Sequence, residues 1–178
     1  MILNLFAKST ANPVPQQLYG AVMAQSRNSA FYTNFGIADT VTGRFDVLSL
    51  HMVLLARRLA GERDALAQDL SQAVFDAFTA NLDDGLRAIG IGDNSVPKRK
   101  KALVHGYYAQ IEAFAAALAT ENADLLAKRA AERFFSGKDG PDAVKMARYM
   151  QAAAKRLDAQ PLAAFLTGVL EFPAPDLH

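Results

Sequence analysis

The sequence contains no cysteine among its 178 residues. A disulfide, a thiolate metal ligand and a cysteine nucleophile are therefore excluded. An excess of one charge sign is also missing, because 19 Lys and Arg stand against 18 Asp and Glu and leave a net charge of +1. Such a chain has no overall field that attracts nucleic acid or a membrane, so an anionic partner must meet a local basic patch.

Long hydrophobic runs are missing as well. The longest apolar stretch, Val47 to Ala56, is interrupted by Ser49 and His51, whereas a membrane-spanning helix needs about 20 apolar residues. The opening residues MILNLFAKST have no basic residue ahead of their short apolar run, unlike a secretory signal peptide. We therefore expect a cytoplasmic protein, with peripheral contact at the inner face of the cytoplasmic membrane left open.

Strand signals are scarce, and helical signals are strong. The chain shows little period-2 alternation and no Asn-Gly or Asp-Gly turn between β-branched runs. Apolar residues recur instead at intervals of three and four, which is typical of helices. These patterns predict an all-α protein, a single compact domain over residues 1–178 with about six to eight helices around a central buried helix. Residues 1–12 and 172–178 are expected to be irregular.

One predicted helix is apolar around most of its circumference and must be covered by its neighbours, so it is the predicted centre of the fold. This helix, at residues 41–60, carries a continuous apolar stripe of Val41, Phe45, Leu48, Met52, Leu55 and Leu59, and further apolar residues on other faces at Val47, Leu50, Val53 and Leu54. The other helices are predicted at 13–27, 63–89 (with Ile89 on its core side), 95–119, 122–135, 142–157 and 161–171, with one or two turns within 28–37.

Three polar residues, Arg44, His51 and Arg58, are spaced seven apart on the central helix. At about 100° per residue they lie on one side of it. We interpret His51 as a partly buried polar residue and Arg58 as a cation that reaches over the edge of the core. Arg44, near the positive end of the helix, is expected to pair with an acid such as Asp39 or Asp46.

The sequence predicts no catalytic residue, no metal site and no cofactor. His51, His105 and His178 have no ligand-type spacing. Neither GxxxxGK[ST] nor GxSxG is present, and Gly90-Ile91-Gly92 is explained by the end of a helix. We therefore expect a protein that is not an enzyme, and a small-molecule enzyme with a helical pocket is the weakest alternative.

A run of four cations, Lys98, Arg99, Lys100 and Lys101, falls in the first turn of a predicted helix. Cations at that positive end cost about 0.3–1 kcal/mol each before screening. Two interpretations stay open: a solvated run partly compensated by Asp93, or a contact for phosphates or anionic headgroups. The second admits an RNA- or ribosome-binding helical module as an alternative function.

Two long stretches resemble the ubiquinol–cytochrome c chaperone family. They are LYGAVMAQSRNSAFYTNFGIADTVTGRFDVLSLHMVLLARRL at residues 18–59 and VFDAFTANLDDGLRAIGIGDNSVPKRKK at 74–101, so the resemblance covers about the first two thirds of the chain, up to Tyr108. After the basic run the chain departs from the expected aromatic-Gly-Arg ending and reads Tyr107-Tyr108-Ala109-Gln110.

The resemblance implies an all-helical, non-enzymatic assembly factor without a cofactor. It would bind newly made cytochrome b and assist assembly of ubiquinol–cytochrome c reductase, respiratory complex III. The implied partners are cytochrome b, a ribosome or an anionic membrane surface at the basic turn, and a further assembly factor; DNA is not among them.

A chaperone of this kind needs exposed apolar surface for its client and a basic patch for docking. If nothing covers them, Leu50, Val53 and Leu54 would add to the apolar surface. The predicted partner-binding residues are the aromatic Phe31, Tyr32 and Phe35, the cation Arg44, and the basic turn of Lys98, Arg99, Lys100 and Lys101.

Overall fold

The computed structural model describes residues 12–88 and 90–175 of the chain. Within these ranges every regular element is a helix, which confirms the predicted all-α class. The elements are α1 (Val14–Ser26), α2 (Ala30–Thr33), α3 (Val41–Ala60), α4 (Ala65–Ala88), α5 (Val96–Ala119), α6 (Ala123–Phe134), α7 (Pro141–Asp158) and α8 (Leu162–Leu166). Residues 1–11, the predicted core residue Ile89 and residues 176–178 lie outside the described part, whereas 172–175 are irregular as expected.

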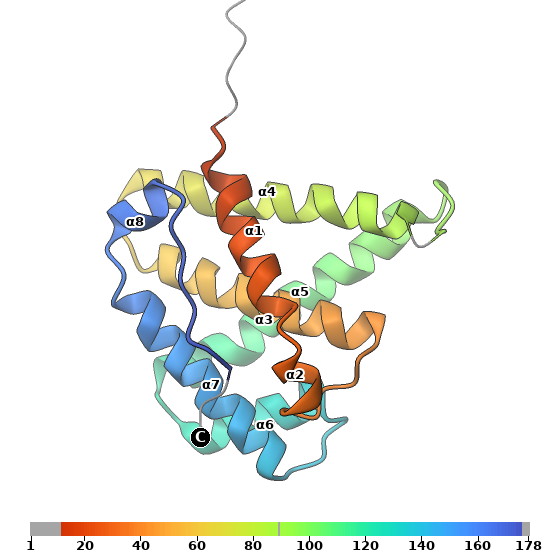
Figure 1. Ribbon diagram of the computed structural model, residues 1–178, viewed down its shortest axis with the longest axis vertical. Helices are drawn as coiled ribbons and strands as arrows, with labels where there is room; N and C mark the ends of the chain where they lie inside the picture. Colours follow the sequence, from red (N-terminus) through yellow and green to blue (C-terminus); the bar gives the residue numbers. More distant parts are fainter. Residues whose placement is uncertain (1–11, 89, 176–178) are drawn as a thin grey trace, which may run out of the picture.

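The central position of α3 is confirmed. All residues from Asp46 to Leu55 are buried, because α1, α4, α5 and α7 all pack against this helix. In Figure 1, α1 crosses in front of α3, α4 runs along the top, α5 passes behind, and α6 and α7 lie below. A helix that is apolar on most sides thus receives cover on most sides.

The start of α3 is fixed by two local interactions. The Thr40 hydroxyl accepts a hydrogen bond from the backbone N–H of Gly43 at 3.1 Å and caps the helix. A Cβ atom at position 43 would collide with the carbonyl oxygen of Ala38. The loop before α3 therefore folds back against the first turn at a distance that only glycine permits, and the helix begins at Val41.

The last predicted helix, at 161–171, is too long by several residues, because α8 ends at Leu166. Two features end it. The Thr167 hydroxyl donates to the carbonyl of Ala164 at 2.9 Å, and Gly168 adopts a positive φ of 84°. The chain beyond α8 then runs back across the molecule toward α7 (Figure 1).

Helices α4 and α5 form an open V around α3. They meet at the right-hand loop of Figure 1 and diverge toward the other side of the molecule. Both helices contact each other and α3. The surface groove described below is lined by residues of both helices away from the loop that joins them.

Candidate functional site

The predicted aromatic segment is mostly interior. Phe31 and Phe35 have no exposed surface, and both pack edge-on against Tyr149 of α7, with ring centroids 5.0 and 5.9 Å apart. The expectation that these two rings lie at the surface is therefore wrong, because α7 covers them. The additional apolar surface considered on α3, at Leu50, Val53 and Leu54, is buried too.

Tyr32 and Arg44 are brought together at the surface. The Arg44 guanidinium lies 5.5 Å from the centroid of the Tyr32 ring and makes two hydrogen bonds to the Asp39 carboxylate, at 2.6 and 3.1 Å. The predicted pairing of Arg44 with Asp39 is thus confirmed. The Arg44 side chain also holds the pKa of Asp39 below its usual range, first through this hydrogen bond.

His51 belongs to a buried hydrogen-bond chain and is completely, rather than partly, buried. Its Nδ1 lies 2.8 Å from the carbonyl oxygen of Val47, and its Nε2 lies 2.6 Å from the hydroxyl of Tyr149. The Gln25 amide donates to the same hydroxyl and to the carbonyl of Pro173, both at 2.9 Å. Burial lowers the pKa of His51 to about 4, so the ring is neutral at pH 7.

Arg58 has a structural role, as interpreted from the sequence. Its guanidinium donates to the carbonyl oxygens of Leu157 and Gln160 at 2.9 Å each, and it pairs with Glu62 at 2.6 Å. These bonds tie the end of α3 to the end of α7 and to the residues that follow it. The polar stripe of Arg44, His51 and Arg58 is therefore occupied by internal contacts.

A second polar link joins the helices α3, α5 and α6. Arg133 of α6 pairs with the buried Asp46 of α3. With its amide oxygen turned toward Arg133, Gln110 of α5 accepts hydrogen bonds at 3.0 and 3.1 Å. Burial raises the pKa of Asp46, and Arg133 opposes that shift. This link holds α3, α5 and α6 in register.

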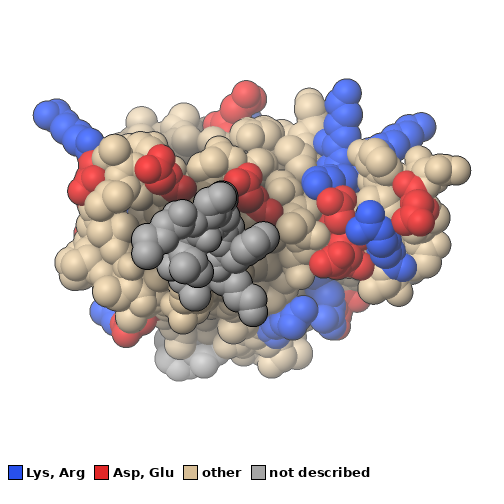
Figure 2. All heavy atoms as spheres, turned by 90° about the horizontal axis from the view of Figure 1, so that it is seen from above, with Lys and Arg blue, Asp and Glu red and all other residues tan. Residues whose placement is uncertain are grey.

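The basic turn lies at the narrow end of the V, and one of its four cations, Lys100, forms an ion pair. Lys100 pairs with Asp83 of α4 at 2.7 Å, whereas Lys98, Arg99 and Lys101 are exposed and have no ion pair among the described residues. Asp93, the compensating acid expected from the sequence, bonds Arg87 instead. Figure 2 shows cationic and acidic side chains close together at the right-hand end of the molecule, where α4 and α5 meet in Figure 1.

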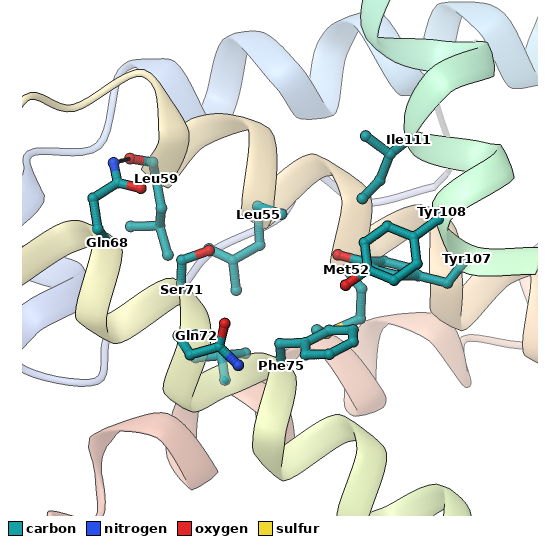
Figure 3. A pocket seen from close by; sticks show the side chains of 12 residues that line it. Met52, Leu55, Leu59, Gln68, Ser71, Gln72, Phe75, Tyr107, Tyr108 and Ile111 are labelled. Atoms are coloured by element: carbon teal, nitrogen blue, oxygen red, sulfur yellow. Dashed lines mark hydrogen bonds between the residues drawn. The ribbon is translucent and has the colours of Figure 1, made fainter. Parts of the chain in front are cut away.

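The structure also contains a surface groove that the sequence did not predict. We call it the α3–α4–α5 groove, and its volume is about 240 Å³. No charged side chain lines it, and Figure 3 shows residues of the three helices converging on it. The lining residues are Met52, Leu55, Ala56 and Leu59 of α3, Gln68, Ser71, Gln72, Val74 and Phe75 of α4, and Tyr107, Tyr108 and Ile111 of α5.

Tyr108 forms the exposed rim of this groove. Half of its side chain is open to solvent (51%), while its neighbour Tyr107 is buried against Phe78 of α4. One sequence signal could have found it. Adjacent helical residues point about 100° apart, so on a helix that is covered on one side only, one of two consecutive tyrosines faces away from the core.

Two further features are absent from the described residues. No helix within them is both long and apolar enough to cross a bilayer. No group of three His, Asp or Glu side chains within them is placed to hold a metal ion.

A central helix packed on most sides, an uncharged surface groove and exposed cations near one end define a helical binding protein. The model of the family described as ubiquinol-cytochrome C chaperone matches residues 33–172, and the chain belongs to this family. The match confirms the resemblance found in the sequence and extends it well beyond Tyr108. The protein is thus an assembly chaperone of respiratory complex III.

A solved structure supports the same assignment. The crystal structure of the Cbp3 homolog from Brucella abortus matches with a TM-score of 0.82 and 30% sequence identity, over 92% of this chain and 90% of that chain. The shared fold therefore includes nearly the whole of both chains. The comparison with curated proteins gave no match.

Proposed function

We propose that this chaperone binds newly made cytochrome b and assists its incorporation into ubiquinol–cytochrome c reductase, without catalysing a reaction and without a cofactor. The observation that carries the proposal is the family match over residues 33–172. A membrane subunit that is not yet inserted exposes apolar segments, and shelter from water for such segments is energetically favourable. The uncharged α3–α4–α5 groove is a surface of suitable chemistry.

We also propose that the protein works on the cytoplasmic side of the membrane and docks there through the basic turn. Lys98, Arg99 and Lys101 are exposed and free of ion pairs within the described part of the chain. Each cation close to an anionic leaflet contributes about 1 kcal/mol of binding. The same three cations fit the phosphates of ribosomal RNA, so ribosome or RNA binding is the second candidate function.

The aromatic segment contributes less to the proposed binding surface than its sequence suggested. Phe31 and Phe35 are enclosed, so only Tyr32, stacked with Arg44, is available to a partner. We propose this pair as the contact for a further assembly factor. Substitution of Arg44 by Glu would remove that contact.

The experiment that tests the function is deletion of the gene, followed by measurement of assembled complex III and of proteins that co-purify with the tagged chaperone. We expect loss of complex III and recovery of cytochrome b with the tagged protein. Normal complex III in the deletion strain would reject the proposal.

A triple variant, with Lys98, Arg99 and Lys101 replaced by Ala, separates the two docking surfaces. Co-sedimentation with vesicles containing phosphatidylglycerol and with purified ribosomes is measured at low salt. If the wild type binds vesicles or ribosomes and the triple variant does not, that binding partner is the one that the basic turn contacts. Binding of neither by the wild type would contradict docking through this turn.

A further inference from the structure

We infer that the α3–α4–α5 groove is the docking site for a helical polypeptide segment with an apolar face and acidic residues at the end that lies toward the start of α5. This inference rests on the proposed function only in that a chaperone holds polypeptide. It specifies the site and the chemistry of the bound segment.

The apolar part of the groove fits bulky side chains of a partner helix. Leu55 and Leu59 of α3 are buried and form its floor, while Phe75 and Ile111 are partly exposed and line its sides. Tyr108 stands half exposed at the rim. A groove between helices that is lined in this way receives the apolar face of an amphipathic helix, read as residues at intervals of three and four.

One wall of the groove is polar, and this favours a polypeptide over the acyl chain of a lipid. Gln68, Ser71 and Gln72 lie along α4 at helical spacing, as Figure 3 shows. The amide nitrogens of Gln68 and Gln72 are engaged, with the Glu62 carbonyl at 3.1 Å and with Asp76 at 2.8 Å. Their side-chain oxygens accept no hydrogen bond from the described residues, so they remain available to donors of a partner's polar flank.

Charge changes sign along the face of α5 beside the groove, because Lys101 lies toward the start of the helix and the exposed Glu112 lies one turn beyond Tyr108. The positive end therefore sets where the acidic residues of a partner would lie. Lys101, His105 and Tyr108 follow one another at steps of four and three, so they lie on one face of α5, and all three are exposed. Seven residues of helix place Lys101 about 10 Å along the axis from Tyr108. Lys98 and Arg99 extend the positive charge further, and the groove lining itself carries none. Acidic residues about two turns from the apolar anchors complement this arrangement.

The test measures the affinity of the full-length protein for two fluorescein-labelled 20-residue helical peptides by fluorescence anisotropy. Both peptides carry the same face of Leu and Phe at intervals of three and four. One ends in three Glu, its counterpart in three Lys, and each is made with the charged end at either terminus. We expect the acidic peptide, in one orientation, to bind at least tenfold more tightly than its basic counterpart.

Two groove variants and one control assign that binding to the groove. Tyr108→Ala removes the aromatic ring at the rim and is expected to weaken binding of the acidic peptide about tenfold, because a tyrosine that a bound segment covers often contributes strongly to binding. Ser71→Arg places a cation inside the groove and should abolish insertion of the apolar face. The matched control is Val144→Ala, which removes an exposed apolar side chain of α7 and should leave the affinity unchanged. Thermal unfolding verifies that each variant is folded.

A charge reversal tests the acidic end separately. Lys101→Glu is expected to reduce the preference for the acidic peptide at least fivefold. The inference is overturned if neither peptide binds or if both bind equally. It is also overturned if Tyr108→Ala binds the acidic peptide as tightly as the wild type and the Val144→Ala control do. It is also overturned if phosphatidylglycerol vesicles, and not the peptides, lose binding on Tyr108→Ala. Because purified components are used, failure here leaves the deletion experiment on complex III unaffected.

Discussion

At the scale of single residues, the buried ring of His51 makes stability depend on pH. The unfolded chain takes up a proton on this ring near pH 6.5, whereas the folded protein resists protonation until about pH 4. The unfolded state therefore binds more protons between these values, and the free energy of unfolding falls as the pH is lowered through them. Each pH unit between the two pKa values corresponds to about 1.4 kcal/mol, so the free energy of unfolding falls by about 3 kcal/mol in total.

Urea unfolding at pH 7 and pH 5 measures this effect. Between these two values the wild type should lose about 2 kcal/mol through His51. His51→Gln removes the titrating ring, so the variant should be less stable at pH 7 but lose less stability on acidification. Equal pH dependence of the two proteins would contradict the buried, neutral state of His51.

Gly43 gives a second prediction at this scale. A methyl group at this position meets the carbonyl oxygen of Ala38, which is backbone and cannot rotate away. Gly43→Ala should therefore destabilise the protein by about 3 kcal/mol, as overpacking does elsewhere. Gly85→Ala is the matched control, since Gly85 is an exposed residue of α4 and no atom lies near the place where a Cβ atom would stand. That variant should gain up to about 1 kcal/mol from better helix propensity, and both values follow from thermal or urea unfolding.

At the scale of elements, the pair Asp46–Arg133 connects α3 with α6. Arg133→Met leaves a buried carboxylate without its cation, and we expect a loss of about 2 kcal/mol, toward the low side for a buried pair because Arg133 is partly exposed. The double variant Asp46→Asn with Arg133→Met should regain part of that loss. Urea unfolding of the two single variants, Asp46→Asn and Arg133→Met, and of the double variant measures the coupling; additive effects would argue against a direct interaction.

The start of α5 separates stability from binding. Cations in the first turn of a helix oppose the helix dipole, so Lys98→Glu, at the third residue of α5, should raise the free energy of unfolding by about 0.5 kcal/mol. The same variant should bind anionic vesicles or ribosomes less well. A melting curve and a co-sedimentation assay measure the two effects. A variant that loses stability and keeps its binding would reverse this interpretation.

Elements were more predictable from the sequence than sites. The apolar residues of α3 include the stripe with Leu48 and Met52 and also residues on the other faces of the helix. Such a pattern predicts a central position, since only a helix surrounded by others can bury all these residues. The aromatic segment was misjudged at Phe31 and Phe35, because the pattern shows that a ring is apolar but not that Tyr149, more than a hundred residues later, covers it. The groove depends on three separate helices and on the angle between α4 and α5, which no local pattern encodes.

At the scale of the whole molecule, the apolar groove and the exposed cations share one V-shaped unit of α4 and α5. The groove is lined by residues of α4 and α5 away from the loop that joins these helices. The basic turn lies at the narrow end, where α4 and α5 meet (Figure 1). Contact of the narrow end with an anionic surface would therefore leave the wide end open. Because Lys101 would also contact the acidic end of a bound segment, docking and the holding of such a segment share this cation.

The half-exposed ring of Tyr108 also has a spectroscopic consequence. The chain contains no tryptophan, so a Tyr108→Trp variant would carry a single indole at the rim of the groove. Its emission should shift to shorter wavelength when a bound segment removes it from water. The variant therefore provides an optical signal for groove occupancy without an added dye, and its response can be followed in real time during a binding reaction.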